Sequence, residues 1–315
     1  MQSKSKQTAF LTQPVVVGLL AMLCCMLWGS AFPCVKIGYR LFGIAGDHTP
    51  SLLLFAGLRF TLAGLLALCI GSIGARRWLI PKPTSWPMIL KLGLVQTVTQ
   101  YIFFYIGVAH ASGVKSSIIV SANVFFSILI SAIVLRQERM TAAKLLGCIA
   151  GFAGVVLINT RGGALDFSMQ WNGEGFVLIS SLAYAISSVM VKQYAKRESP
   201  VTLSGYQFVW GGLVLIAVGL IGGGRIYPTS PAAFLLLGYL GMLSAVAYSL
   251  WAVLLQHNPV SRVSIYGFMN PVCGVFLSAL LLGEQGVFGP AAGIALVLVC
   301  VGIFLVNRSV SQTES

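Results

Sequence analysis

The sequence predicts an all-α membrane protein with ten transmembrane helices, arranged as two inverted five-helix repeats around a central cavity. Three observations predict this fold: the composition, ten long apolar runs, and a similarity between the two halves of the chain. Hydrophobic residues make up 57% of the 315 residues and charged residues only 9%, whereas a typical soluble domain has about 25% charged residues. A soluble core could not bury this much apolar surface, so we expect lipid to surround it.

The composition also excludes several classes of function. The formal net charge is +13, but the charges lie between apolar runs, which favours a role in membrane orientation over nucleic-acid binding. The cysteines all lie in apolar runs, without the spacing of a metal site or a disulfide framework. No GxxxxGK[ST] loop and no HExxH motif occurs in the sequence. We expect no ATP hydrolysis, no cofactor, no metal and no nucleic-acid partner, and a monomeric state is compatible with the sequence.

Ten apolar runs approach the length of about 20 residues that is needed to cross a bilayer. They begin near Val15, Ser51, Met88, Lys115, Thr141, Gly175, Thr202, Ala232, Val260 and Val287. The connections between them are rich in Gly, Pro, Asn and charged residues, as is typical of turns. The fifth connection divides the chain nearly in half.

The distribution of lysine and arginine predicts the orientation. With the N-terminus in the cytoplasm, only Arg40, Lys115, Arg161 and Arg225 fall in connections on the far side of the membrane, as the positive-inside rule requires. The first run has no small-residue cleavage site, so we expect a retained span rather than a signal peptide. The prediction is a multi-pass protein of a bacterial inner membrane, with cytoplasmic tails at residues 1–13 and 308–315.

The second half of the chain is similar to the first. A shift of 147 residues, or one close to it, pairs His110 with His257, Lys115 with Arg262, Asn123 with Asn270, Tyr101 with Tyr248, Glu138 with Glu284, Trp28 with Tyr184, Lys36 with Lys192, Phe60 with Phe208 and Gly64 with Gly212. Each half has five spans, an odd number, so the halves must enter the membrane in opposite directions. Such inverted repeats are typical of secondary transporters, whose substrate site lies near the midplane between the halves.

Several of these segments resemble a known family. They are "WGSAF" with Lys36, "LRF" at residues 58–60, "LRQERMTAAKLLGCIAGFAGVVLI" and "LLLGEQGVFGPAAGIALVLVCVGIFLV". In this order the chain resembles an EamA-type member of the drug/metabolite transporter superfamily over about residues 14–307. The resemblance implies one repeat at 14–160, a loop at 161–173 and a second repeat at 174–307. It also implies a central cavity and export of amino acids or other small metabolites. One departure is that Pro271 follows Asn270 whereas Val124 follows Asn123, so we expect the repeats to bend differently there.

The first span contains residues that a simple anchor would not need. Gly29 and its small neighbours would let another helix approach closely, and Pro33 would free a backbone carbonyl. Lys36 could extend to the outer interface. A gating helix and an ordinary packing helix with a snorkelling lysine both fit this pattern.

Aromatic and polar residues recur at helical spacing in spans three and eight. The stripe in span three contains Gln96, Gln100, Tyr101 and Tyr105, and the stripe in span eight contains Ser244, Tyr248 and Trp251. Two such stripes on repeat-matched helices suit a cavity for amphiphilic or aromatic solutes, although packing between helices is an equal alternative. Trp28 is a further candidate for binding substrate, and Tyr184, Tyr206 and Trp210 would extend the wall less securely.

Other polar residues within or beside the spans are candidates with a structural alternative. Arg59, in the middle of span two, would contact a substrate carboxylate or act as a structural arginine bonded to helix-end carbonyls. The uncharged Gln207 opposite it in the repeat favours the structural role. Asn123 and Asn270 would bind substrate or bond between helices. Glu138 and Glu284 are expected to act as helix caps or ion pairs rather than as proton relays.

These features predict a secondary transporter, not an enzyme, that exports small metabolites such as amino acids or related amphiphilic solutes by alternating access. Alternatives are a carrier for drugs or organic cations, a channel, or an intramembrane enzyme, for which neither an activated nucleophile nor a metal cluster is found. No acidic residue lies in the middle of a span, so a proton-coupled mechanism built on a central membrane carboxylate has no candidate residue.

Overall fold

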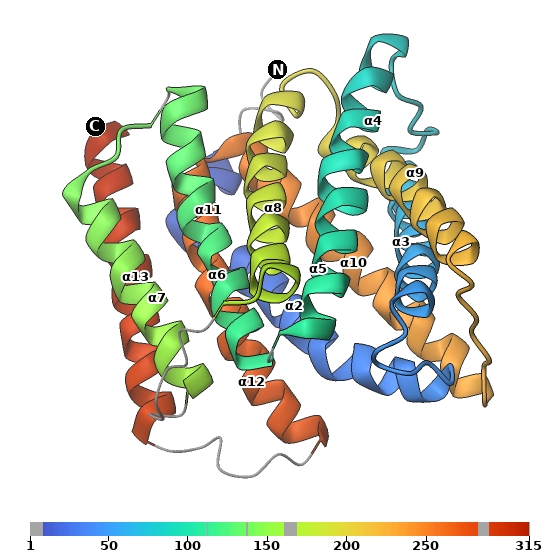
Figure 1. The fold of residues 1–315 in the computed structure, drawn as a ribbon. Helices are drawn as coiled ribbons and strands as arrows, with labels where there is room; N and C mark the ends of the chain where they lie inside the picture. Colours follow the sequence, from blue (N-terminus) through green and yellow to red (C-terminus); the bar gives the residue numbers. More distant parts are fainter. Residues whose placement is uncertain (1–8, 112, 137, 161–168, 283–289, 315) are drawn as a thin grey trace.

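The computed structural model describes residues 9–111, 113–136, 138–160, 169–282 and 290–314 (Figure 1). Ten apolar helices in these ranges are long enough to cross a membrane, and no strand occurs among the described residues. The expected class of a ten-helix membrane protein is therefore confirmed. Spans one to ten are Pro14–Leu41, Thr49–Ala75, Pro83–His110, Lys115–Val134, Ala142–Thr160, Trp171–Tyr194, Pro200–Ile221, Pro231–His257, Val260–Leu281 and Pro290–Val310.

Six spans each consist mainly of one α-helix. These are α2 (Pro14–Leu41), α3 (Thr49–Ala75), α7 (Ala142–Thr160), α9 (Pro200–Ile221), α10 (Pro231–His257) and α13 (Pro290–Glu314). Proline lies in the first turn of most of them, where a missing N–H costs no hydrogen bond and the fixed φ favours helix initiation.

The other four spans are composite. Span three joins the 3₁₀ turn η1 (Pro83–Ser85), α4 (Trp86–Gly93), the π-helix η2 (Leu94–Thr99) and α5 (Gln100–His110). Span four joins α6 (Gly113–Ile130) to the π-helix η3 (Ser131–Leu135), and span six joins the π-helix η4 (Trp171–Gly175) to α8 (Phe176–Tyr194). Span nine joins α11 (Val260–Ser264), the 3₁₀ segment η5 (Ile265–Phe268) and α12 (Met269–Leu282).

The α-helix of span nine is interrupted at a level where that of span four continues. The segment η5 interrupts the α-helix just before Asn270 and Pro271, whereas α6 continues as an α-helix past Asn123. Pro271 lies in the first turn of α12, where proline can start a helix but cannot supply an N–H to the preceding turn. This difference agrees with the unequal sequence of the two repeats at this level.

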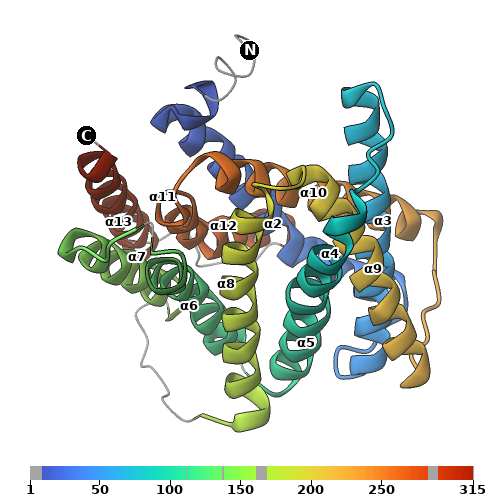
Figure 2. The same cartoon turned by 90° about the horizontal axis from the view of Figure 1, so that it is seen from above.

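Two pairs of helices define opposite sides of the bundle. In Figures 1 and 2, α3 lies along α9 on one side, α7 lies along α13 on the other, and α2, α8 and α10 run between the two pairs. Glycines permit the close approach of α3 and α9. A Cβ atom on Gly64 would lie 2.5 Å from the Gly205 carbonyl oxygen, and one on Gly57 would lie 2.8 Å from the Gly212 carbonyl oxygen.

These two glycine contacts are related by the sequence similarity of the halves. The offset that matches Gly64 with Gly212 also matches Gly57 with Gly205. The contact between Gly57 and Gly212 therefore becomes the contact between Gly205 and Gly64 when each residue is replaced by its match. A two-fold interface has this reciprocal form.

Two spans begin earlier than the hydropathy of the sequence indicates. Span three begins at Pro83 rather than near Met88, and span six begins at Trp171 rather than near Gly175. Glu174 consequently lies in the first turn of span six, where its carboxylate accepts a bond from the Gln170 N–H at 2.9 Å and pairs with Lys115 Nζ at 3.5 Å. The first turn of span six is polar and has low hydropathy, so hydropathy alone does not predict that it is helical. The bond from Gln170 and the ion pair with Lys115 stabilise this turn.

Candidate functional site

Helix α2 carries Trp28 into the centre of the bundle. The residue beside it, Gly29, is the point of closest approach to α12, because a Cβ atom there would lie 2.7 Å from Cys273 Cβ. The expectation that small residues in this segment admit a neighbouring helix is therefore confirmed for Gly29. Pro33 lies inside α2 and is buried, and Lys36 is exposed one turn farther along.

Four aromatic side chains from three helices meet at this point. Trp28 of α2 makes edge contacts with Tyr248 and Trp251 of α10, with ring centroids 5.1 and 5.0 Å apart. The Tyr248 hydroxyl lies 2.9 Å from the hydroxyl of Tyr101 on α5. We call Trp28, Tyr101, Tyr248 and Trp251 the central aromatic cluster. The two predicted stripes on spans three and eight thus contact one another directly.

Two phenylalanines from α3 and α9 extend the central aromatic cluster. Phe60 and Phe208 stack with ring centroids 5.2 Å apart and planes inclined by 12°. Phe60 also lies 4.4 Å from the Tyr101 ring, and Phe208 lies 4.8 Å from the Tyr248 ring. We did not predict either residue at the site. The repeat match between Phe60 and Phe208 was the available signal, because matched residues can touch only near the symmetry axis.

The remaining aromatic candidates lie at different distances from the cluster. Tyr105 is buried, with its ring centroid 6.2 Å from that of Tyr101, and Tyr184 of α8 packs against the hydrophobic core that contains Tyr248. Tyr206 instead packs against Trp86, near the start of span three, with ring centroids 5.5 Å apart. Trp210 is 38% exposed and packs beside Gly93. Neither of the last two lines the cluster.

Arg59 of α3 brings a positive charge to the centre of the bundle. The residue is only 5% exposed. Its Nε and Nη2 atoms donate to the Ser244 hydroxyl at 3.1 and 3.0 Å, and its guanidinium carbon lies 4.9 Å from the centroid of the Phe60 ring. In the described part of the chain it has no acidic partner, and its side-chain bonds to other described residues go to the Ser244 hydroxyl rather than to the helix-end carbonyls expected of a structural arginine.

A second hydrogen bond mirrors that of Arg59. The Thr97 hydroxyl donates to Gln207 Oε1 at 2.7 Å, linking span three to span seven. The offsets that relate the two halves match Arg59 with Gln207 and Thr97 with Ser244. The same two positions are therefore hydrogen-bonded in both halves, through the cation Arg59 in one half and through the neutral amide of Gln207 in the other. The two halves thus differ in charge at equivalent positions.

Several buried polar atoms near the centre of the bundle have no hydrogen-bond partner among the described residues. They include Nε1 of Trp28, Nε1 of Trp251 and Oε1 of Gln100. A buried N–H or carbonyl without a partner costs about 1–3 kcal/mol. At a candidate site, a bound ligand could form hydrogen bonds with such atoms.

The two asparagines lie near η5, Asn123 on α6 and Asn270 at the start of α12. A Cβ atom on Gly267 would lie 3.9 Å from Asn123 Oδ1, which places Asn123 against η5. Asn270 Oδ1 is buried without a partner, and the buried Pro271 follows it on α12. Among the described residues, no hydrogen bond connects either asparagine to the central aromatic cluster.

Glu138 ties the connection between spans four and five to the start of span nine. Its carboxylate accepts bonds from the Val260 N–H at 2.7 Å, the Ser131 hydroxyl at 3.0 Å and the Ser261 hydroxyl, and it pairs with Lys144 Nζ at 3.0 Å. Burial alone would raise the pKa of the Glu138 carboxyl, but the Ser261 bond and the Lys144 charge bring this pKa below its usual value. Such contacts are those of a cap and an ion pair. Its repeat mate Glu284 lies outside the described residues.

No group of three or more His, Cys, Asp or Glu that could hold a metal occurs in the part of the chain that the structure describes. The chemistry of the site therefore consists of cationic, phenolic, indole and amide groups.

Comparisons with known proteins agree with this architecture. The model of the EamA-like transporter family matches residues 16–160 and 171–308. An "uncharacterized transporter" of Archaeoglobus fulgidus is 29% identical over 89% of this chain and 95% of its own length. A "probable terminal-alkyne amino-acid exporter" of Streptantibioticus cattleyicolor is 26% identical over 91% of this chain and 92% of its own length.

Two further comparisons extend this result. A "probable amino-acid metabolite efflux pump" of Salmonella typhimurium is 27% identical over 91% of this chain and 93% of its own length. A crystal structure superimposes with a TM-score of 0.77 and covers 95% of this chain and 99% of the other, at 18% identity. A likeness at that identity shows the fold alone.

Proposed function

Because this chain belongs to the EamA-like transporter family, we propose that it exports small carboxylate-bearing metabolites, such as amino acids or related amphiphilic solutes. The observation that carries the proposal is Arg59, a buried cation without an acidic partner among the described residues. A charge in the middle of a span is costly and is usually retained for function. A substrate carboxylate would supply the missing negative charge.

The groups around Arg59 suit the two ends of an amphiphilic acid. The guanidinium can bind a carboxylate through two parallel N–H bonds. The unpartnered indole N–H groups of Trp28 and Trp251 are further donors for an anionic or carbonyl oxygen. The faces of the same rings can hold an apolar side chain or an ammonium group.

The charge of the site argues against organic cations as the substrate class. Among the described residues, the cluster and its neighbours contain a cation, phenols, indoles and amides, but no carboxylate. A cationic drug would therefore meet Arg59 without a counter-charge. The names of two relatives, an amino-acid exporter and an amino-acid metabolite efflux pump, also favour acids with an amino group.

Alternating access by two inverted repeats is the proposed mechanism. Support comes from the reciprocal contacts of Gly57 with Gly212 and of Gly64 with Gly205, and from the paired bonds of Arg59 and Gln207. If the halves rock about an axis near Tyr101 and Tyr248, the bond between these hydroxyls would close the path in one state and part in another. Inverted repeats commonly move in this way around a fixed site.

Reconstituted protein provides the test. Liposomes loaded with an amino acid should show saturable counterflow of the labelled compound, whereas unsaturable high flux would indicate a channel. The corresponding amine without a carboxylate and a quaternary ammonium compound should compete poorly. Transport should continue without a pH gradient, since no acid lies in the middle of a span. Counterflow that the quaternary ammonium compound inhibits best would reject the proposal in favour of an organic-cation carrier.

A further inference from the structure

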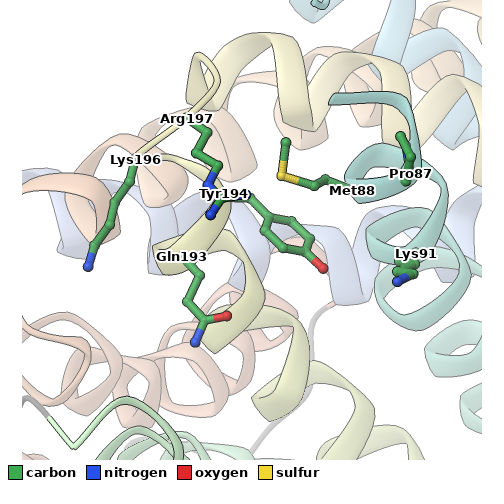
Figure 3. Close-up of a pocket in the computed structure, with 7 residues that line it drawn as sticks. All are labelled: Pro87, Met88, Lys91, Gln193, Tyr194, Lys196 and Arg197. Atoms are coloured by element: carbon green, nitrogen blue, oxygen red, sulfur yellow. The ribbon is translucent and has the colours of Figure 1, made fainter. Parts of the chain in front are cut away.

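A cavity of about 460 Å³ lies between α4 and the end of α8, away from the central aromatic cluster. Its walls are formed by Pro87, Met88, Lys91, Gln193, Tyr194, Lys196 and Arg197. Figure 3 shows the Tyr194 ring reaching from α8 toward Lys91 of α4, with Arg197 above the ring and Lys196 farther out. The lining residues lie where α4 begins and α8 ends, at the end of the bundle at which α13 also ends (Figure 1), and this side is expected to face the cytoplasm.

Only positive charge lines this cavity. Lys91, Lys196 and Arg197 contribute three cations, and no acidic residue contributes to the walls. None of the three forms an ion pair with a described acidic residue. The positive-inside rule explains why cations occur at this side of the membrane, but it does not explain why two helices diverge there to form a hollow lined by three of them.

The two walls of the cavity are held together by Glu198, which follows Arg197 in the chain. Its Oε2 atom accepts bonds from the Lys82 N–H at 3.0 Å and the Ser85 hydroxyl at 2.8 Å, and its Oε1 atom accepts a bond from the Ser199 N–H at 3.0 Å. Lys82 Nζ also donates to the Arg197 carbonyl at 3.2 Å. The start of span three is thus fixed to the connection after span six. Glu198 is used in this clamp and forms no ion pair with the described cations of the cavity.

The outward face of α8 leads from the membrane to the cavity. Leu178, Leu182 and Ile186 are exposed at intervals of four residues, and Gln193 follows on the same face, seven residues after Ile186. Tyr184, which lies toward the central cluster, points about 200° away from Leu182 at 100° per residue. An apolar stripe on this side is expected to contact lipid tails. In span three, Leu90 of α4 and Leu94 at the start of η2 are also exposed, close in the chain to Lys91.

From this arrangement we infer that the cavity binds the phosphate head group of an anionic phospholipid, with the acyl chains along the outward stripe of α8. Basic pockets between spans on the cytoplasmic side suit such head groups. The stripe favours a lipid over a soluble anion, because only a lipid would use both surfaces. A choline head group would place its own cation against Lys91 and Arg197 and is expected to bind less well. Occupancy would fix the clamp between spans three and six, one from each half.

The test measures lipid binding to the full-length protein in detergent by titration with short-chain phosphatidylglycerol and phosphatidylcholine. Removal of one near-surface cation should weaken binding of the anionic lipid about fivefold, so the K91Q/R197Q double variant should lose about 25-fold. The charge-keeping K91R/R197K variant should retain most of the affinity. The R76Q/R77Q variant, which removes two cations at the same end of the bundle but outside the cavity, should behave as wild type.

Three outcomes would overturn the inference. One is equal affinity of the wild type for the two lipids, and another is unchanged selectivity in K91Q/R197Q. A third is that sn-glycerol-3-phosphate binds as tightly as phosphatidylglycerol and displaces it, which would indicate a site for a soluble anion. If the double variant does not fold, R197Q alone carries the test with an expected fivefold loss. Because the readout is lipid binding, it is independent of the proposed substrate.

Discussion

The hydroxyls of Tyr101 and Tyr248 lie 2.9 Å apart although 147 residues separate them in the chain. This separation equals the shift that aligns the two halves of the sequence. Matched residues of a two-fold arrangement can touch only where the axis passes between them. The contact therefore places α5 and α10 at the centre of the bundle. Substitution of the two tyrosines is a direct test of whether this centre takes part in transport.

Replacing either tyrosine by alanine should weaken substrate binding. An aromatic contact contributes about 0.5–1.5 kcal/mol beyond burial, so Tyr101→Ala or Tyr248→Ala should raise the half-saturation concentration roughly three- to tenfold. Counterflow in liposomes measures this change. Tyr227→Ala is the matched control, because Tyr227 is 61% exposed in a connection. Unchanged affinity in both cluster variants would mean that the two rings only pack.

Arg59→Gln should reduce the affinity for substrates that carry a carboxylate and should have little effect on substrates that lack one. A hydrogen bond to a charged group contributes about 1.5–3 kcal/mol, so we expect a loss of roughly 10- to 100-fold for an amino acid and little change for its amide. Arg59→Lys should recover part of the affinity. Equal losses for the acid and the amide, together with a lowered Tm, would show instead that Arg59 supports the fold through Ser244.

Gly64→Ala should destabilise the interface of α3 and α9. The added Cβ would lie 2.5 Å from the Gly205 carbonyl oxygen and 2.7 Å from the Val209 nitrogen, and overpacking of this kind costs about 1–3 kcal/mol. Thermal unfolding in detergent should show a lower Tm. The control is Gly238→Ala in α10, where the added carbon meets nothing within 4 Å and the helix gains about 0.5–1 kcal/mol. Similar effects of the two substitutions would contradict this description of the interface.

Glu138→Gln should destabilise the protein in a pH-dependent manner. The Lys144 side chain is 5% exposed and would keep a buried charge without its partner, at a cost of about 3–5 kcal/mol. Because the folded-state pKa of Glu138 is lowered, its contribution is fully present above the unfolded pKa of about 4.3. It is lost as the pH falls through the lower folded-state pKa.

Thermal unfolding of wild type and Glu138→Gln across pH measures this effect. The Tm difference should stay constant from about pH 8 to pH 5 and disappear at lower pH. In the double variant Glu138→Gln/Lys144→Met the loss should be smaller than in the single variant, since no unpaired charge remains. A difference that vanishes near pH 7 would indicate a raised pKa and a role in proton transfer.

Labelling with a membrane-impermeant maleimide tests the inverted repeats. The connection after span one and its counterpart after span six should lie on opposite sides of the membrane. Gly46→Cys and Lys196→Cys place single exposed thiols in these connections, in a background with Cys69→Ala and Cys300→Ala. Only Gly46→Cys should react from outside intact cells. Reaction of both from the same side would reject the inverted arrangement.

Much of the candidate site could be anticipated from residue type and spacing. The stripes that contain Tyr101, Tyr248 and Trp251 were visible in the sequence, and the structure brings these residues together with Trp28. Sequence reasoning could not separate the asparagines from them, because Asn123 and Asn270 occupy similar depths and residue spacing does not show which way their side chains face. Depth along a span follows from residue number, but the direction of a side chain around the axis depends on how each helix is rotated in the bundle.

The sequence by itself determined the ten spans, because each backbone polar group in lipid must be satisfied within its own helix and about 20 apolar residues are required. It also determined the family and the register of the two halves. Only the tertiary structure decided which distant groups meet, such as Arg59 with Ser244 and Glu138 with Ser261. These contacts depend on the closeness and the angle of helix packing, which glycines such as Gly29 and Gly64 permit but do not specify. The start of span six shows the same limit, since its polar first turn is held by Lys115 and Gln170 and not by its hydropathy.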